Sequence, residues 1–172
     1  MKQLSFFEPS LSSDTRSSDT KPDYWKLFVD GAARNNPGPA AAGIYMVKNE
    51  TVYAKHGFYL GSKTNNQAEY LALIIGLLIL KQHMQPHDLV LIVSDSQLLV
   101  RQFHGMYKVK EPHLKALHTV AQTLVASLQY TIVHIFREDN VEADEQANYA
   151  IDHKVHLSPE LKKMLQQYEI TI

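Results

Sequence analysis

The stretch KLFVDG at Lys26–Gly31 sets the organisation of the chain, because an apolar strand there runs directly into a carboxylate, Asp30. The segment that follows, Ala32–Ala40, is rich in Gly, Asn and Pro, residues that favour turns. An acid at the end of a strand places its charge at the rim of a sheet, beside backbone groups that can contact a ligand. The pattern fits either a functional site or a turn capped by an aspartate, and this stretch alone leaves both interpretations open.

The composition limits the class of protein. The chain has 172 residues, 45% hydrophobic and 20% charged, which suits one globular domain. The net charge of −1 does not indicate a strongly basic nucleic-acid binder, so any site for a polyanion has to be a local patch or to work through a metal. The chain has no Cys, which excludes disulfides and thiolate metal sites. We expect a cytoplasmic protein without a signal peptide, and the longest apolar run, Leu71–Leu80, is too short to span a membrane.

The first residues form a separate segment. Residues 1–23 are predicted to be a disordered tail and linker, because they contain a small polar sequence, SSDT, twice. Near its start lies an apolar cluster made by Gln3, Leu4, Phe6 and Phe7. This cluster resembles the short peptide by which bacterial replication and repair proteins bind the sliding clamp, which would make a clamp a partner. The alternative is a tail that folds back onto its own domain.

Residues 24–152 are predicted to form the domain, and residues 153–172 a C-terminal extension with a short helix. The predicted strands are 27–29, 40–48, 51–60, 89–93 and 130–136. The predicted helices are 66–83, 96–103, 112–128 and 141–151. Short connections make the first three strands antiparallel, and the unbroken apolar run of the fourth is typical of parallel pairing. This order predicts an α/β fold: a five-stranded mixed sheet flanked by helices, with the apolar first helix buried.

Acidic residues recur where the predicted elements begin or end. Asp30 and Asp95 each follow a strand, and Glu69 lies in the first turn predicted for the buried helix. Burying a carboxylate without a partner is unfavourable, so such acids usually pair or bind metal. Asp144 is a fourth candidate, although acids near the start of a helix are common. Carboxylates that converge without basic partners favour Mg²⁺ or Mn²⁺, and two such ions suit hydrolysis of a phosphodiester.

Four motifs in order give the chain a recognisable pattern: FVDGA with NPGPA at 28–40, TNNQAE at 64–69, VSDS at 93–96 and REDNVEAD at 137–144. Together they resemble ribonuclease H type 1, in the compact variety that lacks a basic protrusion. The resemblance implies the ribonuclease H-like fold and an endonuclease that cuts the RNA strand of RNA–DNA hybrids with two Mg²⁺ ions, leaving 3′-hydroxyl and 5′-phosphate ends. It implies that Asp30, Glu69, Asp95 and Asp144 are catalytic and bind the metal.

The same resemblance assigns residues to the substrate. Gly31, Asn35 and Asn36 match a loop that reads the minor groove beside the RNA strand. Thr64 and Asn65 match residues that hold a DNA-strand phosphate, and Asn66 completes an Asn-Asn pair where the family often has Asn-Gln. Many members carry a mobile His before the fourth acid that assists product release; here that loop has no His, and Glu138 is the nearest equivalent.

Two other functions stay open at this stage. The chain could be a non-catalytic nucleic-acid-binding module on the same fold, since a fold does not determine a function. It could also be another metal-dependent nuclease of the same fold. The presence of all four acids argues against the first, and the TNN stretch at 64–66 favours hybrids over duplex DNA. We expect a monomer.

Overall fold

The computed structural model describes residues 21–172. Residues 1–20, which include the predicted clamp-binding residues Gln3, Leu4, Phe6 and Phe7 and most of the predicted tail, lie outside the described residues. None of the helices between residues 21 and 172 has the length and hydropathy needed to cross a bilayer.

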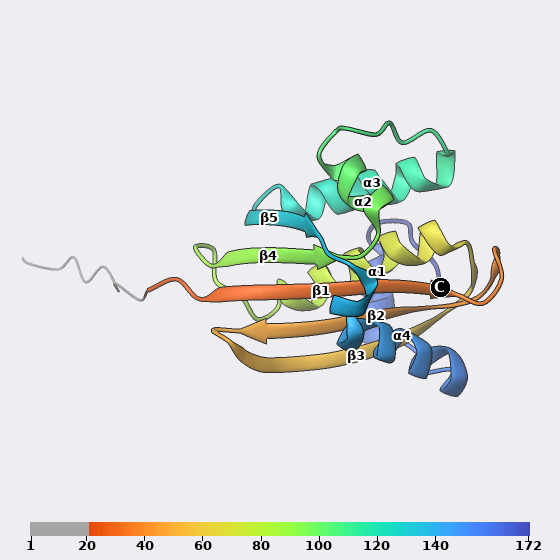
Figure 1. Ribbon diagram of the computed structural model, residues 1–172, viewed down its shortest axis with the longest axis horizontal. Helices are drawn as coiled ribbons and strands as arrows, with labels where there is room; N and C mark the ends of the chain where they lie inside the picture. The colour runs from red at the N-terminus through yellow and green to blue at the C-terminus, as the bar shows by residue number, and fades with distance from the viewer. Residues whose placement is uncertain (1–20) are drawn as a thin grey trace, which may run out of the picture.

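A single mixed sheet runs through the molecule in the order β3-β2-β1-β4-β5 (Figure 1). Its strands are β1 (Tyr24–Ala33), β2 (Gly38–Lys48), β3 (Thr51–Lys63), β4 (Leu89–Ser94) and β5 (Gln129–His134). The first three strands pair antiparallel, whereas β4 pairs parallel with both β1 and β5. The predicted five-stranded mixed sheet is therefore confirmed.

The first strand is longer than predicted. β1 continues past Asp30 to Ala33, and Asp30 lies opposite Gly43 of β2. The prediction that the strand ends at Asp30 was wrong, because the small residues Gly31–Ala33 pair with the equally small Ala40–Ala42 before the chain turns. β3 also continues beyond its predicted end at residue 60, because residues 61–63 pair with residues 38–40 of β2.

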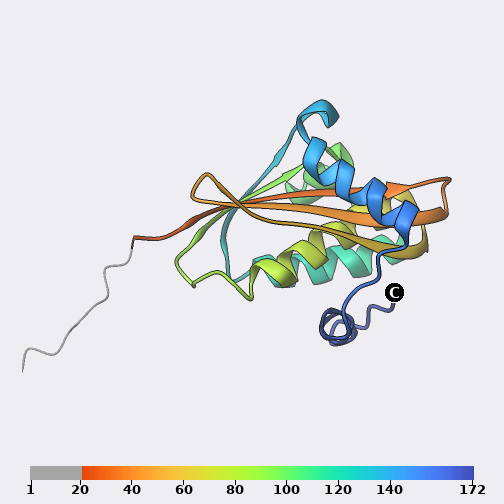
Figure 2. The same ribbon diagram turned by 90° about the horizontal axis from the view of Figure 1, so that it is seen from below.

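Helices cover both faces of the sheet (Figure 2). They are α1 (Asn65–Leu80), α2 (Gln97–Phe103), α3 (Pro112–Val125), α4 (Val141–His153) and α5 (Pro159–Gln166), with a 3₁₀ turn, η1, at Arg137–Asp139. α1 and α3 lie on one face and α4 lies on the other. The chain passes from α2 to α3 without a further helix.

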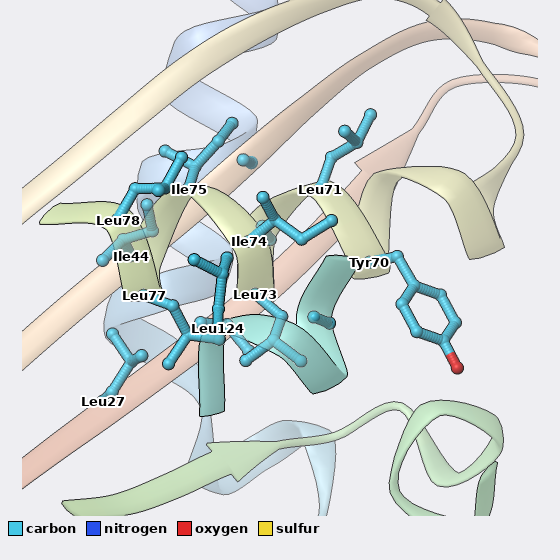
Figure 3. Packing of buried hydrophobic residues seen from close by; sticks show 14 of the residues in the cluster. Leu27, Ile44, Tyr70, Leu71, Leu73, Ile74, Ile75, Leu77, Leu78 and Leu124 are labelled. Atoms are coloured by element: carbon cyan, nitrogen blue, oxygen red, sulfur yellow. The ribbon is translucent and has the colours of Figure 1, made fainter. Parts of the chain in front are cut away.

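The core lies between the sheet and α1. Every residue of α1 from Ala68 to Leu80 is buried, because this helix packs against the strands on one side and α3 on the other. Figure 3 shows Leu27 and Ile44 of the sheet beside Leu77 of α1 and Leu124 of α3. The helix was therefore correctly predicted to be buried, although it ends at Leu80 rather than at residue 83.

The C-terminal residues join the same core. Leu157, Leu161 and Leu165 are buried and belong to the cluster formed by the sheet and α1. The backbone N–H of Tyr59 also donates to the carbonyl of Val155 over 2.6 Å, which ties β3 to the chain after α4. Residues 153–172, predicted as an extension, therefore pack on the domain.

Candidate active site

Two acids emerge side by side where β1 and β4 stop pairing. The last parallel pair is Val29 with Ser94, so Asp30 and Asp95 follow it directly on neighbouring strands. Asp30 is 5% exposed, and Asp95 is half-buried. The prediction that these two carboxylates lie together is confirmed, although Asp30 is inside its strand rather than at the end.

Glu69 reaches this site through a close contact between α1 and β1. A Cβ atom on Gly31 would lie 2.1 Å from the backbone nitrogen of Glu69, so only glycine allows the helix to approach the strand this closely. The N–H of Gly31 donates to Oε2 of Glu69 over 3.1 Å. Because α1 begins at Asn65, Glu69 lies in the second turn of the helix. The prediction that it lies in the first turn was wrong. The Gly31 amide contributes to holding this buried carboxylate.

Three carboxylates converge at the site. One oxygen each from Asp30, Glu69 and Asp95 lies within 4.8 Å of the other two. Burial, followed by the negative charges of Asp95 and Asp144, raises the pKa of Asp30 to about 7. Burial first, and then Asp30 and Asp95, raises the pKa of Glu69 well above its ordinary value.

The donor set fits a hard divalent cation. Oδ2 of Asp30 is buried and has no hydrogen-bond partner. A buried carboxylate oxygen without a partner is unfavourable, and a cation relieves both this loss and the repulsion between the three acids. Ligands that are all oxygen favour Mg²⁺ or Mn²⁺.

Asp144 stands apart from these three acids. It lies on α4, which packs closely on the sheet because Gly43 and Gly57 have no Cβ: at Gly43 that atom would lie 1.9 Å from the carbonyl oxygen of Ala143. Its Oδ1 accepts from Arg137 over 2.6 Å and its Oδ2 from Asn148 over 2.9 Å. Asp144 is not part of the group of oxygens within 4.8 Å found among the described residues.

Asn140 and Arg137, two residues of the fourth motif, also contact the acids, a role that the sequence did not predict. Asn140 is buried, and its Nδ2 donates to the carbonyl of Val29 and to Oδ1 of Asp95. Arg137 pairs with Asp144, and this hydrogen bond raises the pKa of the guanidinium. Their position just before α4 was the only sequence feature that pointed to a role. The partners of Asn140 are far away in sequence, and the pairing of Arg137 with Asp144 depends on how α4 packs.

Of the predicted substrate residues, Gly31 and Asn65 line a cleft together with the acids. The side chain of Asn36 accepts from the N–H of Asn65 over 3.0 Å, which joins the loop after β1 to the start of α1. Asn35 and Asn66 are exposed. Thr64 caps α1: its hydroxyl oxygen accepts from the N–H of Gln67, and its own hydrogen stays available to a ligand.

A cleft of about 280 Å³ connects these groups. It is lined by Asp30, Gly31, Ala32, Ala33, Arg34, Asn65, Glu69, Asp95, Arg137 and Asn148. Glu138, the predicted product-release residue, does not line this cleft; it is exposed in η1 beside Arg137. His134 ends β5, and its Nε2 lies 3.2 Å from the carbonyl oxygen of Asp95.

Comparison with known proteins agrees with the fold and the motifs. Residues 28–150 match the family described as reverse transcriptase-like. Ribonuclease HI of Halobacterium salinarum is 37% identical over 127 residues, covering 73% of this chain and 63% of that protein, so the chain spans less than two thirds of this relative. Ribonuclease H of Coxiella burnetii is 41% identical over 141 residues, covering 73% of this chain and 88% of that protein.

A solved structure gives the same result. LC11-RNase H1, in complex with an RNA/DNA hybrid, superimposes with a TM-score of 0.70 at 37% identity, over 76% of this chain and 98% of that one. The family match over residues 28–150, together with a ribonuclease H that is 41% identical and covered over 88% of its length, establishes the relationship. The chain therefore belongs to the ribonuclease HI family.

Proposed function

We propose that this protein is an endonuclease that hydrolyses the RNA strand of RNA–DNA hybrids with two Mg²⁺ ions, leaving 3′-hydroxyl and 5′-phosphate ends. The observation that carries the proposal is the group of three carboxylates, one with a buried unpartnered oxygen, in an open cleft. The binding of an RNA/DNA hybrid by LC11-RNase H1, 37% identical to this chain, supports the substrate class.

The metal ligands in this proposal are Asp30, Glu69 and Asp95, joined by Asp144 from the rim of the cleft. Ions held by these residues would supply activation of the attacking water and stabilisation of the charge that develops at the phosphate. Mn²⁺ suits the same oxygen ligands. Asn140 holds the Asp95 carboxylate, and the Gly31 amide holds that of Glu69, so both acids are oriented before a substrate arrives.

Recognition of the hybrid is assigned to two segments on one side of the acids. Gly31, Asn35 and Asn36 lie beside the RNA strand, where sugar hydroxyls distinguish RNA from DNA. Thr64, Asn65 and Asn66 hold a phosphate of the DNA strand at the start of α1, where the helix dipole favours an anion. The hydrogen bond between Asn36 and the Asn65 amide supports this assignment because it holds the two segments together.

Two peripheral roles complete the proposal. Glu138 assists product release, and its exposure in the turn before α4 supports a role at the rim of the site. Gln3, Leu4, Phe6 and Phe7 bind a bacterial sliding clamp; only the sequence supports this role.

Cleavage of labelled RNA–DNA hybrid, double-stranded RNA and double-stranded DNA, each with Mg²⁺ or Mn²⁺, tests the main proposal. The wild-type protein is expected to cut the RNA strand of the hybrid, and a 5′-phosphate-dependent exonuclease should degrade the downstream products. Asp30→Asn should abolish cleavage, because it removes a charged ligand at the centre of the cluster.

The control variant is Glu50→Gln. Glu50 is exposed and pairs with Lys26 near the opposite end of β1 from the acids, so its loss should leave cleavage unchanged. An absence of hybrid cleavage by the wild-type protein would reject the proposed function. Equal cleavage by Asp30→Asn would reject the site.

A further inference from the structure

Asp144 differs from the other three acids in its hydrogen-bond partners. Both of its carboxylate oxygens are engaged, Oδ1 by Arg137 over 2.6 Å and Oδ2 by Asn148 over 2.9 Å. The oxygens of Asp30, Glu69 and Asp95 instead converge on one another, within 4.8 Å. The four acids therefore divide into a group of three and a single acid, Asp144, which is paired with the guanidinium of Arg137.

Arg137 is a positive charge set against these acids. Its guanidinium lines the same cleft as Asp30, Glu69 and Asp95, and its side chain is 74% exposed. Its charge lowers the pKa values of Asp30 and Glu69 and so opposes part of the effect of burial. The other arginine lining the cleft, Arg34, is paired with Asp152 over 2.6 Å.

A guanidinium and a metal ion compete for the same oxygen. While Oδ1 of Asp144 accepts from Arg137, a metal ion on that carboxylate would lie close to the positive guanidinium, and this repulsion would weaken its binding. The exposed arginine is free to swing toward solvent, and the loss of one exposed ion pair is small in free energy. Exchange of arginine for metal is therefore accessible at this acid.

We propose that Arg137 is a positioning residue that holds Asp144 away from the three-acid centre until a divalent cation replaces the guanidinium. One cation binds to Asp30, Glu69 and Asp95 with Arg137 in place; a second binds, more weakly, only when Asp144 leaves Arg137. This inference rests on the proposed function, since it assumes that the four acids bind metal. Arg137 would thus set the metal concentration at which the second cation binds.

Titration of the metal-free protein with Mg²⁺ by isothermal calorimetry tests the inference without substrate. Removing a positive charge from the cleft should strengthen binding of a divalent cation roughly fivefold in Arg137→Gln. Arg137→Lys keeps the charge but not the planar fork, so its change should be smaller. The Mg²⁺ concentration that gives half-maximal hybrid cleavage should fall by a similar factor in Arg137→Gln.

A second readout is thermal unfolding in EDTA and in saturating Mg²⁺. In EDTA, Arg137→Gln should unfold at a lower temperature than the wild type, because the acids then have neither metal nor the Arg137 guanidinium to offset their repulsion. Saturating Mg²⁺ should reduce this difference in unfolding temperature. A merely structural role would lower both temperatures equally. Lys26→Gln is the matched control, because Lys26 is also a cation in a surface ion pair, over 2.9 Å, and pairs with Glu50 rather than Asp144.

The outcomes separate the two proposals. If Arg137→Gln binds Mg²⁺ no more tightly than the wild type, or if Lys26→Gln shows the same gain, the role of Arg137 is rejected while the nuclease assignment stands on wild-type cleavage. If the wild-type protein neither binds Mg²⁺ or Mn²⁺ nor cuts the hybrid, both proposals are rejected.

Discussion

The side-chain amide of Asn140 donates a hydrogen bond to the carboxylate of Asp95 over 3.2 Å, and the same nitrogen donates to the carbonyl of Val29 over 3.0 Å. One buried amide thus connects the residue that precedes α4 with the ends of the two strands that carry Asp30 and Asp95. Its Oδ1 is buried without a partner. An unpartnered buried oxygen is unfavourable, so the position of Asn140 must be fixed by the groups around it. A fixed position allows Asn140 to orient the Asp95 carboxylate.

Asn140→Ala should therefore affect both stability and activity. The substitution leaves the Val29 carbonyl without this donor and frees the Asp95 carboxylate, so we expect a loss of about 1–3 kcal/mol in the free energy of unfolding. Hybrid cleavage should fall at least tenfold, since small displacements of reacting groups have large effects on rate. Urea denaturation and steady-state cleavage measure the two effects. Gln166→Ala, at an exposed position of α5, is the control; unchanged activity in Asn140→Ala would argue against an orienting role.

Gly31→Ala should be among the most harmful single-methyl changes. The new Cβ would lie 2.1 Å from the Glu69 nitrogen, so α1 has to move away from β1. Overpacking of this kind costs about 1–3 kcal/mol or more, and the displaced Glu69 should weaken Mg²⁺ binding. Gly61→Ala is the contrasting variant: its φ is +71° and nothing lies within 4 Å, so only backbone strain of about 1–2 kcal/mol is expected. Chemical denaturation and calorimetry would show whether Mg²⁺ affinity changes only in Gly31→Ala.

The raised pKa of Asp30 predicts a pH dependence of stability in the metal-free protein. The folded pKa of about 7 lies above the ordinary value of 3.8, so the folded state retains a proton that the unfolded state releases, and stability falls as pH rises from about 4 to 7. Asp30→Asn removes this effect. It should stabilise the metal-free protein at pH 8 by on the order of 2–4 kcal/mol and far less near pH 4.

Urea denaturation in EDTA at the two pH values measures this difference. Addition of Mg²⁺ should stabilise the wild-type protein more than Asp30→Asn, because binding to the folded state alone raises its stability. A stabilisation of Asp30→Asn that is equal at both pH values would show that the carboxylate charge is not its cause.

The C-terminal helix should contribute to stability and not to chemistry. Leu165 is 1% exposed and packs on the core cluster, so Leu165→Ala is expected to cost about 2–5 kcal/mol. Lys162→Ala, at a neighbouring exposed position, should have little effect. At a temperature where both variants are folded, hybrid cleavage should equal that of the wild type, because α5 contributes no residue to the cleft. A loss of cleavage in folded Leu165→Ala would contradict this separation.

Local sequence alone determined the elements and most of the acidic site. The apolar run at 71–80 predicted a buried helix, and two shorter apolar runs predicted strands followed by Asp30 and Asp95, because such runs are properties of short segments. The ends of the elements were less well predicted. β1 passes Asp30 because its small residues find partners on β2, and such pairing depends on residues about ten positions away.

Only the tertiary structure decided how the acids are divided and held. The sequence motifs assign Asp144 the same metal-binding role as the other three acids. Packing of α4 on Gly43 and Gly57 instead places it at the rim of the cleft, paired with Arg137. The contact of Asn140 with Val29 joins residues 111 positions apart. Residue types and local periods specify which groups are present and on which element. The distances between those groups depend on how closely the elements pack, which is a property of the whole core.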